Sequence, residues 1–515
     1  MKTNKLILLL TALVTVYACD KEFLETNPTA ELSAEQVGEA VAVNPAAAKG
    51  TLLGIYEQFY RFGSGGGHGQ EDFGTKINDI NTDILSGDLA HTGKSYGRQT
   101  GFSELTATVD PSDRFNYGAW RYLYRVINLS NLVIDGLGGD EADLTSDVSK
   151  FTIGQAKAAR GIAYFYLIHY YIDDISNLSQ DAIPLYTNSE QREQPKSTLQ
   201  QVFDQTVLDL TTAETLLDGF SRSSKIEFNQ DIVRGWLAYT YGALNNWAKT
   251  AEYAKKVIDS GNYPIMTAEE VAVLGGTDAV GGFNDVNSHP GIMWGIDVTA
   301  DQELASLYTW WGFMDYFSYS YAAVGNRKAI DLGLYNQIRE DDIRLNQFPF
   351  TQFGAGYLVP AGKFYYKGAQ NEWAADIPTA YEGFAGPQTN VDSDAHYMRV
   401  AEMYLLHAEA SAEGGNEAVA KESLKALLDL RITDHSYVDA LTGEDLLDEI
   451  SFQTRLELFA EGKSYLLMKR QRQSRTRGAN WLDFAGETFQ HNDDRLSYEL
   501  PENELLFNPF IDDQN

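Results

Sequence analysis

The chain has 515 residues, of which 43% are hydrophobic and 22% are charged, and its formal net charge is −33 at pH 7. This composition provides enough apolar material for one large core or for two or three smaller domains. Such an acidic surface repels phosphate backbones and anionic head groups, which argues against a nucleic-acid-binding protein and against membrane attachment through basic patches.

The first residues are typical of an export signal. A short basic start precedes the apolar run 6–16, which is too short to span a bilayer as a stable anchor. Cys19 is the one cysteine of the chain, so it cannot form an intrachain disulfide, and it lies where a lipobox cysteine would be acylated. We expect residues 1–18 to be a lipoprotein signal peptide and residues 19–33 to be a lipidated tether, because two or more acyl chains anchor a protein stably. A plain secretory peptide with an unmodified cysteine is the alternative.

Apolar residues recur at helical spacing along much of the chain. These periods cover residues 45–60, 115–137, 153–171, 199–217, 229–244 and 247–260. Residues 399–431 predict two further helices, which return on each other at the turn Gly414-Gly415-Asn416. One helical hairpin cannot bury its own apolar faces, so we expect several hairpins to stack. A last long helix is expected at 445–471. The predicted fold class is mainly α, with tetratricopeptide-like helical hairpins.

Two stretches lack this period. Residues 71–108 show no clear helical pattern, and residues 275–394 are punctuated by glycine, proline and aromatic residues, with one possible strand at 292–298. Long irregular segments are often functional. The string that starts at Asp79 begins like a calcium-binding loop, but Ile84 occupies the position where that loop needs glycine, so we reject an EF-hand.

Three signatures of catalytic sites are absent from the sequence. It contains no His-Glu-x-x-His, no cysteine pair and no Gly-x-x-x-x-Gly-Lys. Adjacent carboxylates carry little information among 73 acidic residues. We therefore predict no catalytic residue, no metal site and no cofactor.

Several strings follow one another along the chain. They are Cys19–Leu24, Trp120 with Asn128 and Asn131, Ala156–Phe165, Ile183–Leu185, Trp247–Tyr263, Met398–Ala410, Glu457–Gly462 and Asn508–Asn515. In this order they resemble the SusD-like (RagB/SusD) family of nutrient-binding outer-membrane lipoproteins of Bacteroidetes. The chain departs from the family pattern at Ser464 and Leu467, where an arginine and an aspartate are usual, and at Gln453, where a glutamate is frequent.

The resemblance implies a single SusD-like domain at residues 34–515. Its helical body would cover about 34–274 and 395–515, around a loop-rich insertion at about 275–394. It also implies a lipid-anchored protein that faces the outside of the cell, binds a glycan without catalysis and delivers it to a SusC-like TonB-dependent transporter. A peptide-binding member of the family, a lipid-anchored glycoside hydrolase and a scaffold that binds only proteins are the alternatives.

Aromatic density points to candidate ligand-binding residues. Aromatic faces stack on sugar rings, and nearby polar groups fix the hydroxyls. Ligand contacts in the family come mainly from insertions and from loops near the first hundred residues. The candidates are therefore Trp310, Trp311, Tyr316, Tyr319 and Tyr321 in the insertion, then Tyr96, Arg98, Asp79 and Asp83, and finally Trp373. The alternative for the insertion cluster is that its rings form a core beneath the loops.

Overall fold

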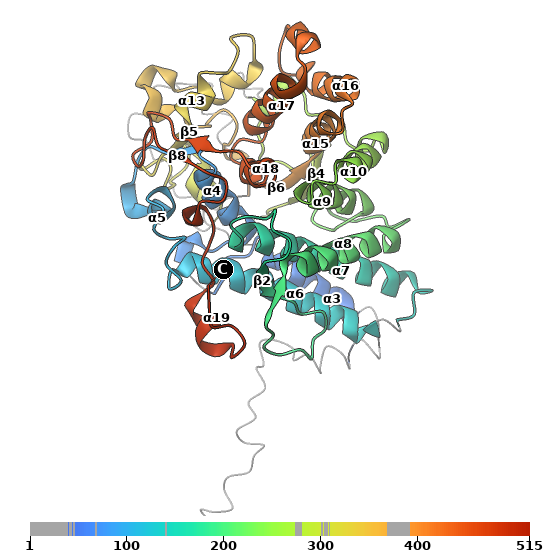
Figure 1. Ribbon diagram of the computed structural model, residues 1–515. Coiled ribbons are helices and arrows are strands. Elements are labelled where there is room, and N and C mark those ends of the chain that lie inside the picture. The colour runs from blue at the N-terminus through green and yellow to red at the C-terminus, as the bar shows by residue number, and fades with distance from the viewer. Residues whose placement is uncertain are drawn as a thin grey trace, which may run out of the picture.

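The protein is described by a computed structural model that covers residues 40, 44, 47–66, 69–139, 142–272, 281–299, 302, 307, 309–367 and 392–514. Helices dominate this part of the chain, and its strands form only two-stranded ladders (Figure 1). The predicted mainly-α class is confirmed. The signal peptide, the tether with Cys19 and the candidate Trp373 lie outside the described residues. No described helix combines the length and the apolar character needed to cross a bilayer.

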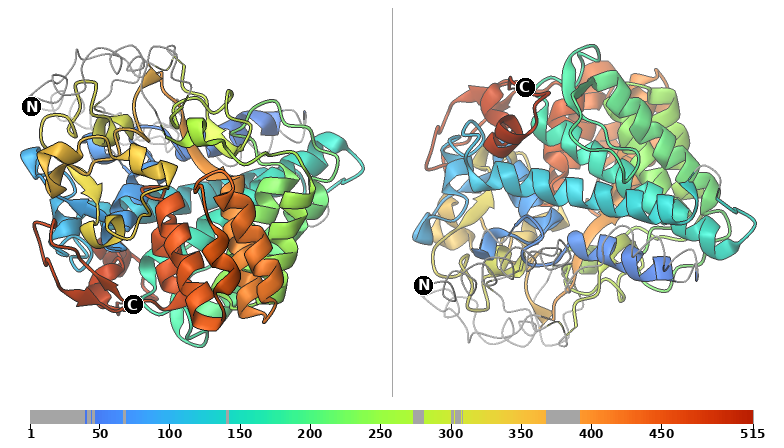
Figure 2. Two further views of the ribbon diagram at one scale, coloured as in Figure 1. Left: turned by 90° about the horizontal axis from the view of Figure 1, so that it is seen from above. Right: turned by 90° about the horizontal axis from the view of Figure 1, so that it is seen from below.

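Most of the long helices form one continuous stack. Its members are α3 (Ala48–Gln58), α6 (Arg114–Gly136), α7 (Asp147–Tyr171), α8 (Leu199–Leu216), α9 (Gln230–Ala243), α10 (Trp247–Asp259), α15 (Val400–Glu413), α16 (Glu417–Leu428) and α17 (Gly443–Glu457). Each helix from α3 to α10 packs on the next one in this order, and α10 then packs on α15, which contacts both α16 and α17. Figure 2 shows the orange and red helices lying beside the green ones, although a long segment separates them in sequence.

Polar caps explain where these helices begin. The side chain of Asp113 accepts a hydrogen bond from Phe115 N at the start of α6, and Asn229 accepts one from Ile232 N at the start of α9. Thr198 forms a capping box with Gln201 at the start of α8. Each cap satisfies backbone N–H groups that the first helical turn leaves without partners. The predicted turn between α15 and α16 is confirmed, with Gly415 at φ 78°.

The expected helix at 445–471 is wrong in its middle, because two helices occupy this stretch. The first is α17, and the second is α18 (Lys463–Gln471). The backbone between them turns through Ala460 at φ 59° and Gly462 at φ 74°. Gly462 N donates to the buried carboxylate of Asp83 at 3.0 Å. This tertiary hydrogen bond holds the break, which a local helical period does not reveal.

The prediction for 71–108 missed a helix, since this stretch contains α4 (Thr75–Leu85). Ile77, Ile80 and Ile84 do recur at helical spacing, but the helix has only 11 residues. Its polar face is buried as well, and Lys76 there pairs with Asp79 at 2.8 Å.

Short elements surround the stack. They are α5 (Thr100–Ser103), α11 (Ala268–Val271), α12 (Trp311–Met314), α13 (Leu332–Tyr335) and α19 (Glu502–Phe507), with the antiparallel strand pairs β1 (Leu89–His91) and β5 (Lys328–Ile330), β2 (Asp181–Pro184) and β3 (Lys196–Thr198), β4 (Ile292–Ile296) and β6 (Ala395–Arg399), and β7 (Arg475–Thr476) and β8 (Thr488–Phe489). The strand expected at 292–298 is confirmed as β4. Its pairing with β6, which leads directly into α15, returns the chain to the stack.

Candidate ligand-binding site

The strand pair β1–β5 brings the first irregular segment against the insertion. His91 lies opposite Lys328 in this ladder. The pairing continues beyond the strands, because Thr92 N donates to Arg327 O at 2.9 Å and Ser95 N donates to Gly325 O at 3.3 Å. The chain that leaves β1 therefore runs beside the chain that enters β5, and residues that are remote in sequence meet there.

Tyr96 lies at the turn that follows β1 and presents its ring to solvent. Tyr96 is 69% exposed, and its backbone has a φ of 62° and a ψ of 5°. An L-residue in this left-handed region carries a strain of about 1 kcal/mol or more. The Tyr96 ring meets the ring of Tyr321 edge-on, with centroids 5.6 Å apart and planes 68° apart. An exposed aromatic ring in a strained backbone conformation is a feature typical of a functional surface.

Arg98 lies against the ring of Tyr321. Its Cζ atom is 4.5 Å from the centroid of the Tyr321 ring, and Nη2 donates to the Tyr321 hydroxyl at 2.9 Å. Nη1 donates to Oε2 of Glu71 at 2.9 Å. Burial disfavours the charge of Arg98, but hydrogen bonding and attraction to Glu71 outweigh that effect and raise the pKa of Arg98. The guanidinium is therefore charged and fixed in place. We call Tyr96, Arg98 and Tyr321 the Tyr96 platform.

Buried polar groups hold the platform from below. Glu71 accepts hydrogen bonds from the backbone N (3.2 Å) and the side-chain Nε2 (2.8 Å) of Gln99, and it also pairs with Arg114. Asn326 Nδ2 donates to Arg98 O at 3.0 Å. These contacts fix the loop through both its side chains and its backbone, which is the kind of preorganisation that lowers the entropic cost of binding.

A layer of aromatic rings lies beneath Tyr321. The ring of Phe313 stacks on Tyr321 with centroids 5.3 Å apart, and Phe73 follows at 5.5 Å from Phe313. Lys328 Nζ is buried 5.6 Å from the Phe313 ring and donates to Asn326 Oδ1 at 2.6 Å. Burial lowers the pKa of Lys328 to about 7. The layer therefore supports the platform, and its own rings are not exposed.

The other candidates from the aromatic run occupy different environments. Tyr319 is 37% exposed and lies two positions before Tyr321. Tyr316 is buried, where its hydroxyl accepts from Lys328 N at 3.1 Å. Tyr319 therefore keeps part of its surface open to solvent, whereas Tyr316 braces the start of β5.

Trp310 and Trp311 lie in the core, with only 3% and 2% of their surfaces exposed. Their rings pack edge to face with centroids 4.9 Å apart, and Trp310 makes a second such contact with Phe364. Trp311 Nε1 donates to Asp394 O at 3.2 Å. The expectation that these two rings offer open faces for stacking is therefore corrected, and the alternative of a core beneath the loops describes them.

Asp79 and Asp83 are also removed from the surface, because both lie on the buried helix α4. Asp79 pairs with Lys76, and Asp83 accepts from Gly462 N. Burial raises the pKa of Asp83 well above its usual range. Asp83 therefore joins α4 to the turn before α18, Asp79 forms an ion pair within α4, and neither faces a ligand.

The sequence carried no signal for the residues that support the platform. Glu71, Gln99 and Asn326 were not among the candidates, and nothing in their local pattern distinguishes them. Their role depends on the β1–β5 pairing, which joins positions more than 200 residues apart. In the described part of the chain, no group of three His, Cys, Asp or Glu residues has the arrangement of a metal site.

Comparisons with known proteins agree with this architecture. A SusD-like family model described as "Starch-binding associating with outer membrane" matches residues 74–243, and a model described as "SusD family" matches residues 365–507. Together the two matches span more than half of the chain. A search of curated proteins finds no match.

Solved structures show the same fold over almost the whole length. A SusD-like carbohydrate-binding protein from Bacteroides vulgatus is 23% identical, with 90% of this chain and 96% of that chain covered and a TM-score of 0.70. A SusD superfamily protein from Bacteroides thetaiotaomicron is 20% identical, with 91% and 98% covered and a TM-score of 0.71. Surface glycan-binding protein A from Bacteroides thetaiotaomicron, solved in complex with laminarihexaose, is 15% identical, with 91% and 98% covered and a TM-score of 0.62. The helical stack, the order of its elements and both family matches lead to one conclusion: the chain belongs to the SusD-like family.

Proposed function

We propose that this protein captures a glycan on the Tyr96 platform and delivers it, chemically unchanged, to a SusC-like TonB-dependent transporter. In this proposal, lipidated Cys19 and the tether at 19–33 attach a single domain, residues 34–515, to the outer face of the outer membrane. The observation that carries the proposal is the exposed ring of Tyr96 against the ring of Tyr321, which also holds the fixed guanidinium of Arg98.

The chemistry of the platform suits a neutral sugar. The ring of Tyr96 can stack on the C–H face of a pyranose, and the edge-on ring of Tyr321 limits where that pyranose can lie. Nη2 of Arg98 donates to both Tyr321 and Gln70, so Arg98 can donate to a sugar hydroxyl through the Nη1–H that Glu71 leaves unused.

The platform is poorly suited to glycoside hydrolysis. That reaction requires two carboxyl groups on either side of the scissile bond. Glu71, the carboxylate bound to Arg98, has a side chain that is only 1% exposed, and it also pairs with Arg114. It is therefore held in two ion pairs as a buried structural group and does not reach a substrate.

Calorimetric titration with a panel of oligosaccharides that includes laminarihexaose tests this proposal. We expect at least one glycan to bind, and Tyr96→Ala to weaken that binding by about tenfold or more, because the stacking face is lost. Leu506→Ala is the control, since Leu506 is 67% exposed on α19 and does not belong to the platform. Equal affinities for the wild type and Tyr96→Ala would reject the platform, and release of new reducing ends would reject a purely binding role.

A separate experiment tests the location. Cells that express the full chain would be fed a radiolabelled fatty acid and then treated with an external protease. We expect the wild type to take up label and to be cleaved on intact cells, and Cys19→Ala to lose the label. Copurification with a transporter from solubilised outer membranes would test the delivery step.

A further inference from the structure

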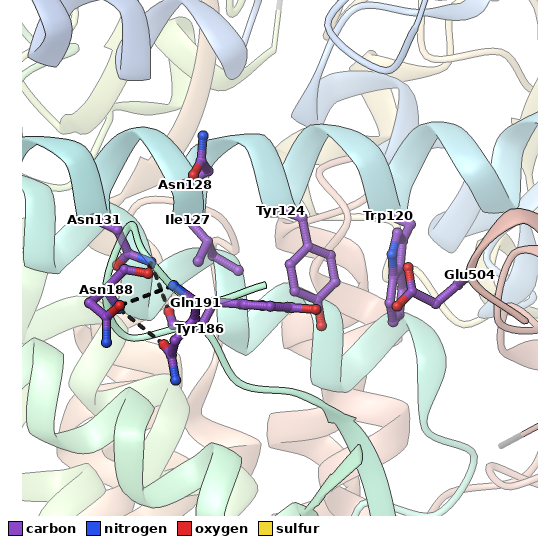
Figure 3. Close-up of a pocket in the computed structure, with 9 residues that line it drawn as sticks. All are labelled: Trp120, Tyr124, Ile127, Asn128, Asn131, Tyr186, Asn188, Gln191 and Glu504. Carbon is purple, nitrogen blue, oxygen red and sulfur yellow. Dashed lines mark hydrogen bonds between the residues drawn. The ribbon is translucent and has the colours of Figure 1, made fainter. Parts of the chain in front are cut away.

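A second open pocket lies on the surface of α6, away from the Tyr96 platform. Its volume is about 240 Å³. It is lined by Trp120, Tyr124, Ile127, Asn128, Asn131, Tyr186, Asn188, Gln191 and Glu504, which come from α6, from the loop that follows β2 and from α19 (Figure 3). It shares no residue and no secondary-structure element with the platform.

Three aromatic rings form one wall of this pocket. The centroids of Trp120 and Tyr124 are 4.6 Å apart, and those of Tyr124 and Tyr186 are 5.7 Å apart with planes at 87°. The Tyr124 hydroxyl donates to Pro184 O at 2.9 Å, and Tyr186 N donates to the hydroxyl of Tyr164 at 2.7 Å. The wall is therefore built from rings whose positions are fixed by hydrogen bonds.

Two side-chain amides at one end of the pocket are held through their oxygen atoms. Gln191 Oε1 accepts from Thr187 N at 2.6 Å and from Asn188 N at 3.2 Å. Asn188 Oδ1 accepts from Gln191 N at 3.1 Å. The nitrogen atoms Gln191 Nε2 and Asn188 Nδ2 donate to no protein atom among the described residues. Each amide thus has a fixed plane and two N–H groups that remain available to a ligand.

A carboxylate lies at the other end. Figure 3 shows Glu504 beside Trp120, with the two tyrosine rings between this pair and the amides. Glu504 Oε1 accepts from Asn508 Nδ2 at 2.8 Å, which leaves Oε2 as an acceptor. No lysine or arginine lines the pocket. An anionic ligand would meet only like charge here, so the pocket suits a neutral molecule that offers both donors and acceptors.

We propose that this pocket binds one ring of a neutral saccharide, as a second carbohydrate site on the same chain. The aromatic wall covers the C–H face of the ring, the amides of Asn188 and Gln191 donate to its hydroxyls, and Glu504 accepts from a hydroxyl at the opposite end. The volume lies below the range of about 300–1,000 Å³ that is usual for drug-sized ligands, so a single ring is the appropriate size. The site goes beyond the function proposed above, because it binds independently of the Tyr96 platform.

The test uses a double variant that changes the polar groups and preserves their structural contacts. Gln191→Glu keeps the acceptor for Thr187 N and Asn188 N but removes the amide donors. Glu504→Gln keeps an acceptor for Asn508 and replaces the free carboxylate oxygen with a donor. The net charge is unchanged. Glu502→Gln, an exposed residue on the same helix, is the matched control.

Saturation-transfer NMR would be recorded with glucose, galactose, mannose and N-acetylglucosamine, and with glucuronic acid as an anionic probe. Tyr96→Ala removes the platform, so any remaining signal reports the pocket. We expect Tyr96→Ala protein to bind at least one of the four neutral sugars, to bind it about tenfold more weakly when Gln191→Glu and Glu504→Gln are added, and not to bind glucuronic acid.

Loss of all neutral-sugar signal in Tyr96→Ala protein would overturn the pocket proposal, as would a signal that the double variant leaves unchanged. Binding that responds to the double variant but not to Tyr96→Ala would support the pocket and reject the platform. Equal melting temperatures of the variants and the wild type would show that any loss of signal reflects the pocket and not unfolding.

Discussion

Arg98 donates to the buried carboxylate of Glu71 with 2.9 Å between Nη1 and Oε2. Glu71 belongs to the segment before α4, and Arg98 belongs to the turn after β1, so this ion pair closes the loop that displays Tyr96. The pair limits the side chain of Arg98 to one arrangement, with its guanidinium against the face of Tyr321. The position of the guanidinium is thus determined by a residue that never meets solvent.

Glu71→Gln is predicted to weaken glycan binding, although residue 71 lies beneath the platform and does not contact the ligand. The substitution keeps the size of the side chain but removes the charge that holds Arg98, so we expect the affinity to fall by about tenfold and the free energy of unfolding to fall by about 1–3 kcal/mol. Calorimetry and urea denaturation would measure the two effects. Glu104→Gln is the control, because Glu104 is 45% exposed and pairs with Lys94. An unchanged affinity in Glu71→Gln would show that Arg98 needs no such support.

The positive φ of Tyr96 predicts an unusual order of stability among its variants. Glycine adopts φ 62° without strain, whereas alanine retains the strain of an L-residue, so we expect Tyr96→Gly to be more stable than Tyr96→Ala by about 1 kcal/mol. Both variants should lose glycan binding. The control pair is Phe507→Gly and Phe507→Ala on α19, where glycine should be the less stable of the two. The same order at both positions would contradict the strain argument.

Substitution by alanine is predicted to destabilise the protein much more at Trp311 than at Tyr319. Trp311 is buried and hydrogen-bonded to Asp394 O, so Trp311→Ala should lower the free energy of unfolding by about 3–5 kcal/mol. Tyr319→Ala should cost less than about 1 kcal/mol, because Tyr319 is 37% exposed. Thermal unfolding of the two variants would measure this difference. A stable Trp311→Ala protein would contradict the assignment of Trp311 to the core.

His169 is predicted to make the protein less stable in acid. Burial lowers its pKa from 6.5 to about 3, and its Nδ1 lies 2.8 Å from Phe165 O. Above pH 6.5 the imidazole is neutral in both the folded and the unfolded states. Between about pH 3 and 6.5 the unfolded chain binds a proton that the folded chain does not, so the free energy of unfolding falls as the pH falls.

Urea denaturation of the wild type and of His169→Gln would measure this contribution. Between pH 7.5 and 4.5 we expect the variant to lose roughly 2–3 kcal/mol less stability than the wild type. Parallel pH profiles of the two proteins would show that His169 is protonated to the same extent in both states.

The helical hairpins were predictable because their signals are local. The turn at Gly414-Gly415-Asn416 and the apolar stripe of α16 lie within a few residues of each other, so one window of sequence contains the whole argument. The helix α4 has a stripe of Ile77, Ile80 and Ile84, but it is short and stands in an otherwise irregular stretch, which makes it a weak local signal. That its polar face is also buried, with Lys76 satisfied by a partner in the core and not by water, is visible only in the tertiary structure.

The candidate site was predictable only in part. Tyr96, Arg98 and Tyr321 were each singled out, but their contact depends on the pairing of β1 with β5, two strands of three residues each that carry no pattern of their own. Trp310 shows the opposite problem, because an aromatic run has the same composition whether its rings stack on a ligand or on Phe364. Burial decides between these roles, and burial follows from tertiary structure.

The direct packing of α10 on α15 makes the helical stack independent of the length of the segment between them. Residues 260–399 leave the stack after α10 and rejoin it at α15, so their length does not alter how these two helices meet. Each doubling of the length of a loop adds only about 0.6 kcal/mol of closure entropy. Insertions in the loops of this segment would therefore change the surface near Tyr321 while the packing of α10 on α15 persists.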